Sequence, residues 1–263
     1  MRIFDSHCHL QWHEEEDPVG PRLQRSRDEG VKRWLCVAVD LPSAKRALEL
    51  AQFEGVSASI GVHPNDVADG KDWPQCFQEI RQLLASGGFS AIGETGLDYF
   101  RTRSDPAAQA QAFRDHLQLA KESRLPVIVH SREATEDALR LLQEAEVHSG
   151  VMHCWSNPVA SLDGFLDLDL HISFAGNLTY PKNEELREAA QRVPANRLLV
   201  ETDAPFLAPQ AKRGKRNESS FLPHTLEFLA ELRTESMTEL AEITWQNAED
   251  LFGSWLNPKP QAS

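Results

Sequence analysis

The 263-residue chain lacks several features, and each absence narrows the class of protein. It has no run of roughly 18 to 20 uninterrupted apolar residues, the length that a membrane-spanning helix needs. Its first residues lack the basic-then-apolar order of a secretion signal, because a strand pattern begins at once. We therefore expect a cytoplasmic protein without a membrane partner. The four cysteines (Cys8, Cys36, Cys76 and Cys154) contain no Cys-x-x-Cys pair, so we expect all four to be reduced.

The chain also has little positive charge. It contains 27 basic and 40 acidic residues, for a net charge of −13. This balance argues against a general nucleic-acid coat protein, which would be basic. It leaves room for a nuclease that has a local basic patch and bound divalent cations, since the ions carry positive charge of their own.

Short apolar runs alternate with helical spacing along the whole chain, without a linker or a change in composition. The pattern predicts a parallel sheet with helices outside it, and eight repeats favour a single (β/α)8 barrel of the TIM type with two further amphipathic helices at 223–252. We expect residues 1–256 to form this barrel and 257–263 to be a flexible tail. The expected strands are 2–5, 34–39, 56–62, 89–93, 125–129, 150–152, 171–175 and 197–201; the helices are 42–53, 73–85, 105–123, 133–146, 157–166 and 183–191; residues 12–21 read as an acidic loop.

An open doubly wound sheet is the alternative architecture. No Gly-x-Gly-x-x-Gly or P-loop turn follows any expected strand, which disfavours it. An open sheet would also leave unexplained why polar residues end five separate strands. In barrels of the TIM type, the catalytic residues sit at the carboxyl ends of the strands.

The polar residues at the expected strand ends are of the kinds that ligate metals. Side chains alternate along a strand, so His7 and His9 should point the same way. Any one histidine could instead be a hydrogen-bonded core residue, but four at one face of a barrel favour metal binding. Six groups with nitrogen and oxygen donors indicate two divalent ions, whether Mg²⁺, Mn²⁺ or Zn²⁺, bridged by a carboxylate and a hydroxide. The candidate ligands are His7, His9, Glu94, His130, His153 and Asp203.

Several neighbouring residues fit supporting roles. His63, which precedes Pro64, suits a contact with substrate better than a metal ligand. Glu201 lies two residues before Asp203, so it could brace a ligand from behind or be a buried structural acid. We expect Asp98 to cap or close its own loop.

A basic loop follows the eighth expected strand, with Lys212, Arg213, Lys215 and Arg216 in five residues. Loops at this position of a barrel frequently bind phosphate. A solvated loop would look the same in sequence, but the nearby candidate metal site favours phosphate binding. Trp155 could stack on a nucleic-acid base, although an aromatic residue there is as often packed in the core.

The order of motifs resembles the TatD family of metal-dependent deoxyribonucleases, within the amidohydrolase-like metal hydrolases. The matching stretches cover nearly the whole chain. They are Phe4-Asp5-Ser6-His7-Cys8-His9-Leu10, Ile60-Gly61-Val62-His63-Pro64, Ile92-Gly93-Glu94-Thr95-Gly96-Leu97-Asp98-Tyr99, Pro126-Val127-Ile128-Val129-His130-Ser131-Arg132, His153-Cys154-Trp155-Ser156, Leu199-Val200-Glu201-Thr202-Asp203-Ala204-Pro205-Phe206-Leu207, Arg216-Asn217-Glu218 and the closing Thr244, Asn247 and Leu251-Phe252.

The resemblance implies a TIM-type barrel that hydrolyses phosphodiester bonds in single-stranded DNA or at 3′ ends, as a 3′–5′ exodeoxyribonuclease. By analogy with the family, one ion is held by His7, His9, Glu94 and Asp203, and the other by Glu94, His130 and His153. Asp203 and Glu94 would be the catalytic residues, with Asp203 also the general base. No obligate protein partner is implied.

Two departures from the family pattern concern substrate loops. Trp155-Ser156-Asn157 stands where the family usually has Phe-Ser-Gly, and Ser219 stands where Pro commonly follows Arg-Asn-Glu. His63, Arg216 and Asn217 are the expected substrate contacts beside Trp155. The alternative functions are a small-molecule amidohydrolase or esterase with the same two-metal site, and a degenerate barrel that only binds a partner; the complete ligand set argues against the second.

Overall fold

The computed structural model describes residues 1–67, 72–101 and 103–253. The predicted boundary at residue 256 and the predicted tail at 257–263 lie outside these residues. Among the described residues, no helix is long and apolar enough to cross a membrane. All four cysteines are free, as predicted.

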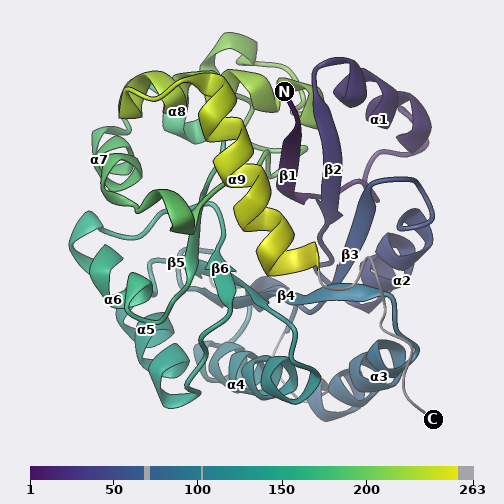
Figure 1. Ribbon diagram of the computed structural model, residues 1–263. Helices are drawn as coiled ribbons and strands as arrows, with labels where there is room; N and C mark the ends of the chain where they lie inside the picture. Colours follow the sequence, from purple (N-terminus) through teal and green to yellow (C-terminus); the bar gives the residue numbers. More distant parts are fainter. Residues whose placement is uncertain (68–71, 102, 254–263) are drawn as a thin grey trace.

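Eight parallel strands follow one another around a barrel in sequence order, with helices packed outside them (Figure 1). This confirms the predicted (β/α)8 architecture. The strands are β1 (Ile3–Cys8), β2 (Val31–Cys36), β3 (Val56–Ile60), β4 (Phe89–Asp98), β5 (Val127–Arg132), β6 (Gly150–Met152), β7 (His171–Phe174) and β8 (Leu198–Val200). The helices are α1 (Val19–Asp28), α2 (Leu41–Leu50), α3 (Trp73–Ala85), α4 (Pro106–Ser123), α5 (Thr135–Glu144), α6 (Leu162–Leu166), α7 (Glu184–Arg192), α8 (Leu222–Arg233) and α9 (Met237–Phe252).

The barrel closes between its first and last strands just beyond β8. Cys8 pairs with Ala204 in a parallel bridge. The Asp203 amide donates to the His7 carbonyl at 2.9 Å, and the His9 amide donates to the Ala204 carbonyl at 2.9 Å. Closure therefore brings the segment that carries Asp203 beside the two histidines of β1.

Helix α9 covers the amino-terminal end of the barrel (Figure 1). Its Trp245 and Phe252 rings lie 6.0 Å and 6.3 Å from the ring of Phe4, which points inward from the start of β1. These residues belong to one buried cluster with inward-facing side chains of β2, β5 and other strands, such as Leu35 and Ile128. The polar residues of the candidate site lie at the opposite, carboxyl-terminal end of the barrel.

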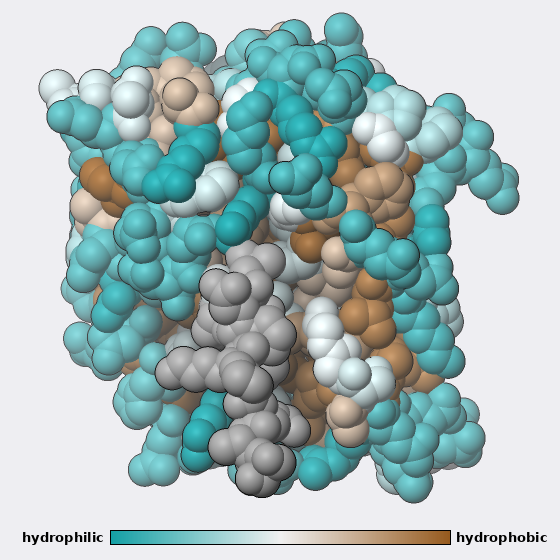
Figure 2. All heavy atoms as spheres, turned by 45° about the vertical axis from the view of Figure 1, so that its right-hand side comes forward, coloured by the Kyte–Doolittle hydropathy of each residue, from teal (hydrophilic) through white to brown (hydrophobic). Residues whose placement is uncertain are grey.

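Seen from one side, hydrophilic residues cover most of the surface, and hydrophobic residues show in the recesses between them (Figure 2).

Helix starts follow the local chemistry that the sequence predicts. Asp105, at the start of α4, accepts from the Ala108 amide at 3.1 Å, and Pro106 occupies the first helical position, where no amide hydrogen is needed.

Three elements differ clearly from the sequence prediction. Helix α1 was not predicted, because only Val19, Leu23 and Ser26 are buried in it and Gly20-Pro21 interrupts its pattern. Strand β4 does not end at Gly93 but continues through Asp98. The predicted helix over 157–166 is a short 3₁₀ turn followed by the five residues of α6.

Glycines allow β4 to lie against β5 at the level of the site. A Cβ on Gly96 would lie 2.0 Å from the His130 carbonyl oxygen, and one on Gly93 would lie 2.7 Å from the Ile128 carbonyl oxygen. Both residues have φ near +140° (138° and 140°), which other residues rarely adopt. This close approach brings Glu94 of β4 against His130 of β5.

Candidate metal centre

Glu94 lies at the centre of the candidate site, and its two carboxylate oxygens face different histidines. Oε2 lies 3.4 Å from Nε2 of His7 and 4.0 Å from Nε2 of His9. Oε1 lies 2.9 Å from Nε2 of His153 and 3.0 Å from Nδ1 of His130. The side chain is 4% exposed. One oxygen of this buried carboxylate therefore faces the two histidines of β1, and the other faces His130 and His153.

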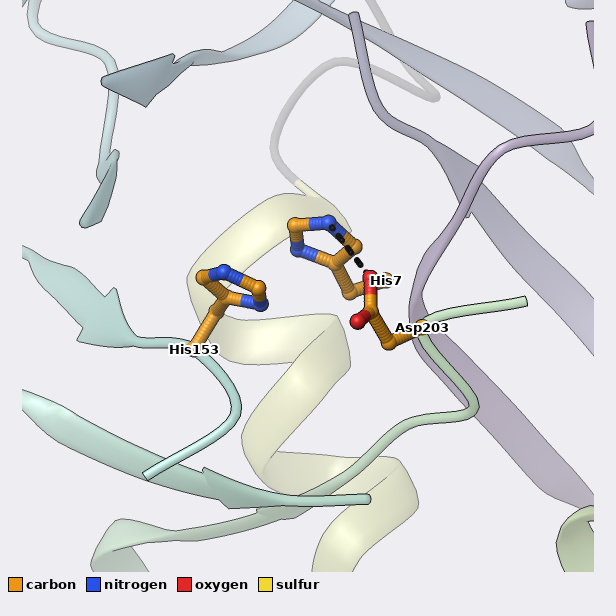
Figure 3. Close-up of side chains that lie close together, drawn as sticks. All are labelled: His7, His153 and Asp203. Atoms are coloured by element: carbon orange, nitrogen blue, oxygen red, sulfur yellow. Dashed lines mark ion pairs between the residues drawn. The ribbon is translucent and has the colours of Figure 1, made fainter. Parts of the chain in front are cut away.

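Asp203 approaches the β1 histidines from the loop after β8. Its Oδ1 lies 3.5 Å from Nε2 of His9 and 3.8 Å from Nε2 of His7. In Figure 3, Asp203 and His153 flank His7, each entering from a different segment. The Asp203 side chain is 16% exposed against 4% for Glu94, so Asp203 is the more accessible of the two carboxylates.

Three of the four histidines have their second ring nitrogen held by an acceptor. His9 Nδ1 donates to the Val37 carbonyl at 2.8 Å. His153 Nδ1 lies 3.1 Å from Glu201 Oε1, and His130 Nε2 lies 3.3 Å from Asp98 Oδ2. In a neutral ring, such acceptors keep the proton on the outer nitrogen and leave the lone pair of the inner nitrogen toward the centre. This is the arrangement of metal-ligating histidines.

The surroundings of the His7 ring show whether the residues of the site fit a metal ion. Among the described residues, neither of its ring nitrogens has a hydrogen-bond partner, although the ring is fully buried. The ring stacks on that of His153 at 3.9 Å. A buried polar atom without a partner is costly, and a metal ion would satisfy it. The potential ligand atoms of His7, His9 and Glu94 lie within 4.8 Å of one another, as do those of Glu94, His130 and His153.

The electrostatics favour a charged carboxylate in a buried site. Burial alone would raise the pKa of Glu94, but the positive charge of His153 and the hydrogen bonds from His130 and His153 hold it well below its usual range. Burial lowers the pKa of His7, helped by the neighbouring charge of His153. For His153, burial also acts to lower the pKa, but Glu94 and Glu201 outweigh it and raise the pKa well above its usual value.

His63 is oriented differently from the candidate ligands. Its Nδ1 accepts a hydrogen bond from the Asn65 amide at 3.1 Å, so a neutral ring carries its proton on Nε2. That Nε2 lies 3.6 Å from Glu94 Oε1. Burial lowers the pKa of His63 to about 4. The ring therefore presents an N–H donor to the centre, which suits a contact with a substrate oxygen better than metal ligation.

Asp98 does more than the sequence predicted. Its Oδ1 accepts from the amides of Phe100 and Arg101, both at 3.0 Å, which closes the loop as expected. Its Oδ2 also faces His130. The signal was available, because Glu94 and Asp98 are four residues apart and therefore share a face of a strand. Because the predicted strand ended at Gly93, the shared face of Glu94 and Asp98 was not recognised.

A second layer of acids lies beneath the site. Glu201 is completely buried and faces His153, as a brace for a ligand would. Asp5, which the sequence did not single out, is also fully buried and accepts from the amide and the hydroxyl of Thr202 at 2.9 Å and 2.7 Å. Burial raises the pKa of Asp5 to about 6. Asp5 thereby ties β1 to the segment that leads to Asp203.

Two predicted substrate contacts need correction. Trp155 is 1% exposed and its ring packs edge-on against Phe165 at 5.5 Å, so it offers no face to a nucleic-acid base. Asn217 is 4% exposed, and its side-chain amide donates to the carbonyls of Thr202 at 2.8 Å and Phe206 at 2.6 Å. The Asn217 side chain therefore stabilises the loop that follows β8 by linking two parts of its backbone.

The basic loop lies beside the site, and its Lys212, Arg213 and Arg216 side chains have partners. The Arg213 guanidinium lies over the ring of Tyr180 at 4.1 Å, and the Lys212 ammonium lies over the ring of Phe221 at 5.3 Å. Arg216 forms an ion pair with Glu16. Lys215 and Arg216 also line a cavity of about 280 Å³ whose wall includes His9.

An eight-stranded barrel with a histidine and carboxylate cluster at the carboxyl ends of its strands is the architecture of a metal-dependent hydrolase. The family model described as "TatD related DNase" matches residues 4–253. The chain belongs to the TatD family of metal-dependent hydrolases.

Similar proteins carry related names. The chain is 39% identical over 261 residues to the uncharacterized metal-dependent hydrolase YcfH of Escherichia coli strain K12, covering 96% of each chain. It is 36% identical over 262 residues to a protein of Erwinia tasmaniensis named 3′-5′ ssDNA/RNA exonuclease TatD, covering 95% of this chain and 99% of the other. The crystal structure of the TatD homolog YjjV from E. coli superposes with a TM-score of 0.90 at 29% identity, covering 96% of this chain and 98% of that one.

Proposed function

We propose that this protein hydrolyses phosphodiester bonds in single-stranded DNA from the 3′ end, with two divalent ions at the candidate centre. The observation that carries the proposal is the position of Glu94, whose two oxygens face two separate histidine pairs. Such a carboxylate is suited to bridging two ions. The exonuclease name of relatives such as the E. tasmaniensis protein supports the choice of substrate.

Under this proposal, His7, His9, Glu94 and Asp203 would hold one ion, and Glu94, His130 and His153 would hold the other. When bound, divalent ions activate water at neutral pH and neutralise charge on a phosphate. Asp203 is the more exposed carboxylate, and burial, which alone would raise its pKa, is outweighed by His9 and His7, so its pKa is lowered. Asp203 is therefore ionised and can be reached by water, so we assign to it the role of accepting a proton from water.

The substrate side of the site has donors of its own. The Nε2–H of His63 faces the centre and suits a non-bridging phosphate oxygen. Lys215 and Arg216 line the cavity beside His9, where they would neutralise phosphates further along a strand. Exposed cations of this kind supply affinity that depends on salt, because each phosphate contact releases counterions.

A direct test uses a short single-stranded DNA labelled at its 5′ end, incubated with the metal-stripped protein and with Mg²⁺, Mn²⁺ or Zn²⁺ added back. We expect a ladder that shortens from the 3′ end, only when a metal is present. Absence of DNA cleavage with all three ions would overturn the proposal. Metal-dependent hydrolysis of small esters or amides in the same preparation would then favour the small-molecule hydrolase.

A salt series tests the role of the basic loop. We expect Arg216→Ala and Lys215→Ala to flatten the dependence of log Kd on log salt by about 0.7 each for single-stranded DNA. Arg140→Ala is the matched control, because Arg140 is also an ion-paired surface arginine but lies on the outer helix α5. Slopes that are equal in wild type and all three variants would mean that the loop is only a solvated surface.

A further inference from the structure

Two aromatic side chains from distant parts of the sequence form a step at the edge of the candidate metal centre. The Trp12 ring stacks on the ring of His9, with centroids 4.2 Å apart and an angle of 23°. The Phe206 ring meets Trp12 edge-on at 5.5 Å and 73°. It also lies edge-on to His9 at 6.5 Å. We call Trp12 and Phe206 the aromatic step.

The Phe206 ring is exposed, although its backbone is held in place. Phe206 is 51% exposed. Its amide donates to the Asp203 carbonyl at 2.9 Å, and its carbonyl accepts from the Asn217 side chain at 2.6 Å. On the other side of the step, the Trp12 amide donates to the His9 carbonyl at 3.2 Å. Each ring is thus anchored through the main chain to a candidate metal ligand, while one of them keeps a face toward solvent.

An exposed aromatic ring held in one orientation beside a charged site is suited to stacking on a planar ligand. Every nucleobase has a π-face, so an aromatic platform binds single strands with little sequence preference. A base can lie on such a platform only when it is unpaired. The other candidate for stacking, Trp155, is buried and leaves this role open.

We propose that the aromatic step binds the nucleobase next to the scissile phosphate, with the exposed ring of Phe206 as the stacking face and Trp12 fixing its angle. The proposal rests on the proposed nuclease function and adds a specificity device to it. The stacked base belongs either to the nucleotide that carries the reacting phosphate or to the adjacent nucleotide. Stacking of this base would hold the reacting phosphate beside Asp203. It also makes an unpaired end the preferred substrate.

The test compares Phe206→Ala with Phe206→Tyr, which keeps the ring, on short single strands. Each strand carries an abasic residue at one of the last three positions from the 3′ end. We expect wild type and Phe206→Tyr to lose about ten- to a hundredfold in kcat/KM when the stacked base is absent. On intact DNA, the kcat/KM of Phe206→Ala should already be lower than that of wild type by this factor. For this variant, kcat/KM should not fall further on the abasic strand.

Phe53→Ala is the matched control, because Phe53 is also exposed, at 42%, but lies in the turn between α2 and β3, at the opposite end of the barrel. It should behave as wild type. Metal content is measured for each variant, so that a change at Asp203 is recognised. If wild type cleaves DNA but Phe206→Ala keeps the full abasic penalty at every position, the stacking proposal fails and the nuclease proposal stands. If wild type cleaves no DNA, the nuclease proposal itself fails.

Discussion

Replacing Glu94 by glutamine tests whether one carboxylate serves two ions. The change keeps the size of the side chain and removes its charge. Glutamine has one carbonyl oxygen, so its amide group would point N–H donors at one of the two histidine pairs. In the structure, one oxygen lies 3.4 Å from His7 and the other 2.9 Å from His153. The substitution should therefore weaken both metal positions at once.

The magnitude follows from what each position loses. Removing a group that only orients a ligand costs about 10- to 100-fold in metal affinity. Glu94 contacts both histidine pairs directly, so we expect more than about 100-fold at each position, or roughly 3 kcal/mol per ion. Activity at micromolar metal should fall to background, and excess metal should restore little of it.

The assay is metal content after gel filtration, combined with calorimetric titration of the stripped protein and turnover of single-stranded DNA. Circular dichroism reports whether the barrel remains folded. Glu122→Gln is the control, since Glu122 is an exposed glutamate paired with Arg81 on the outer helices. Glu94→Gln protein that keeps two tightly bound ions and normal turnover would refute the assignment of Glu94 as the bridge.

Three further predictions concern residues around the centre. Glu201→Gln should leave the fold intact but lower metal affinity about 10- to 100-fold, because it weakens the acceptor that orients His153; chelator titrations that match wild type would contradict this. His116 is fully buried with its pKa lowered from 6.5 to about 4, so the unfolded chain takes up its proton first and stability is lost as pH falls from 6.5 toward 4. Between pH 7 and 5 the loss from this group is about 2 kcal/mol, and urea unfolding of His116→Gln should show a loss smaller by that amount; equal losses would mean that His116 is not held neutral. Trp155→Ala should lower the free energy of unfolding by about 3–5 kcal/mol, because its ring is packed against Phe165, and should leave the abasic penalty of DNA cleavage unchanged in the folded fraction; an unchanged unfolding midpoint would contradict the buried position.

Local patterns in the sequence were sufficient for the barrel and for most of the ligand-type residues at its mouth. Alternation of apolar runs with helical spacing depends on neighbours in the chain, and eight such repeats close in one way. His7 and His9 share a face because a strand repeats every two residues, and this needs no distant contact. Where the local signal was weak, the prediction failed: α1 has few buried residues, and glycines concealed the second half of β4 with Asp98 at its end.

The direction of Trp155 was decided by the tertiary structure. Cys154 has a φ of 44°, in the left-handed region, so the chain turns just after His153. The Trp155 amide then donates to the Ser173 carbonyl of β7 at 2.9 Å, and the ring enters the core instead of the site. A residue next to a candidate ligand in sequence was thereby carried away from it in space.

The reverse holds for the aromatic step. Trp12 and Phe206 are far apart in the sequence, and no local pattern connects them. Their contact exists because barrel closure sets the loop after β8 beside the loop after β1, through the backbone bonds of His7 and His9 with Asp203 and Ala204. Local periodicity determines which residues face the mouth of the barrel, whereas the distance between two loops depends on the closed ring of strands that holds them.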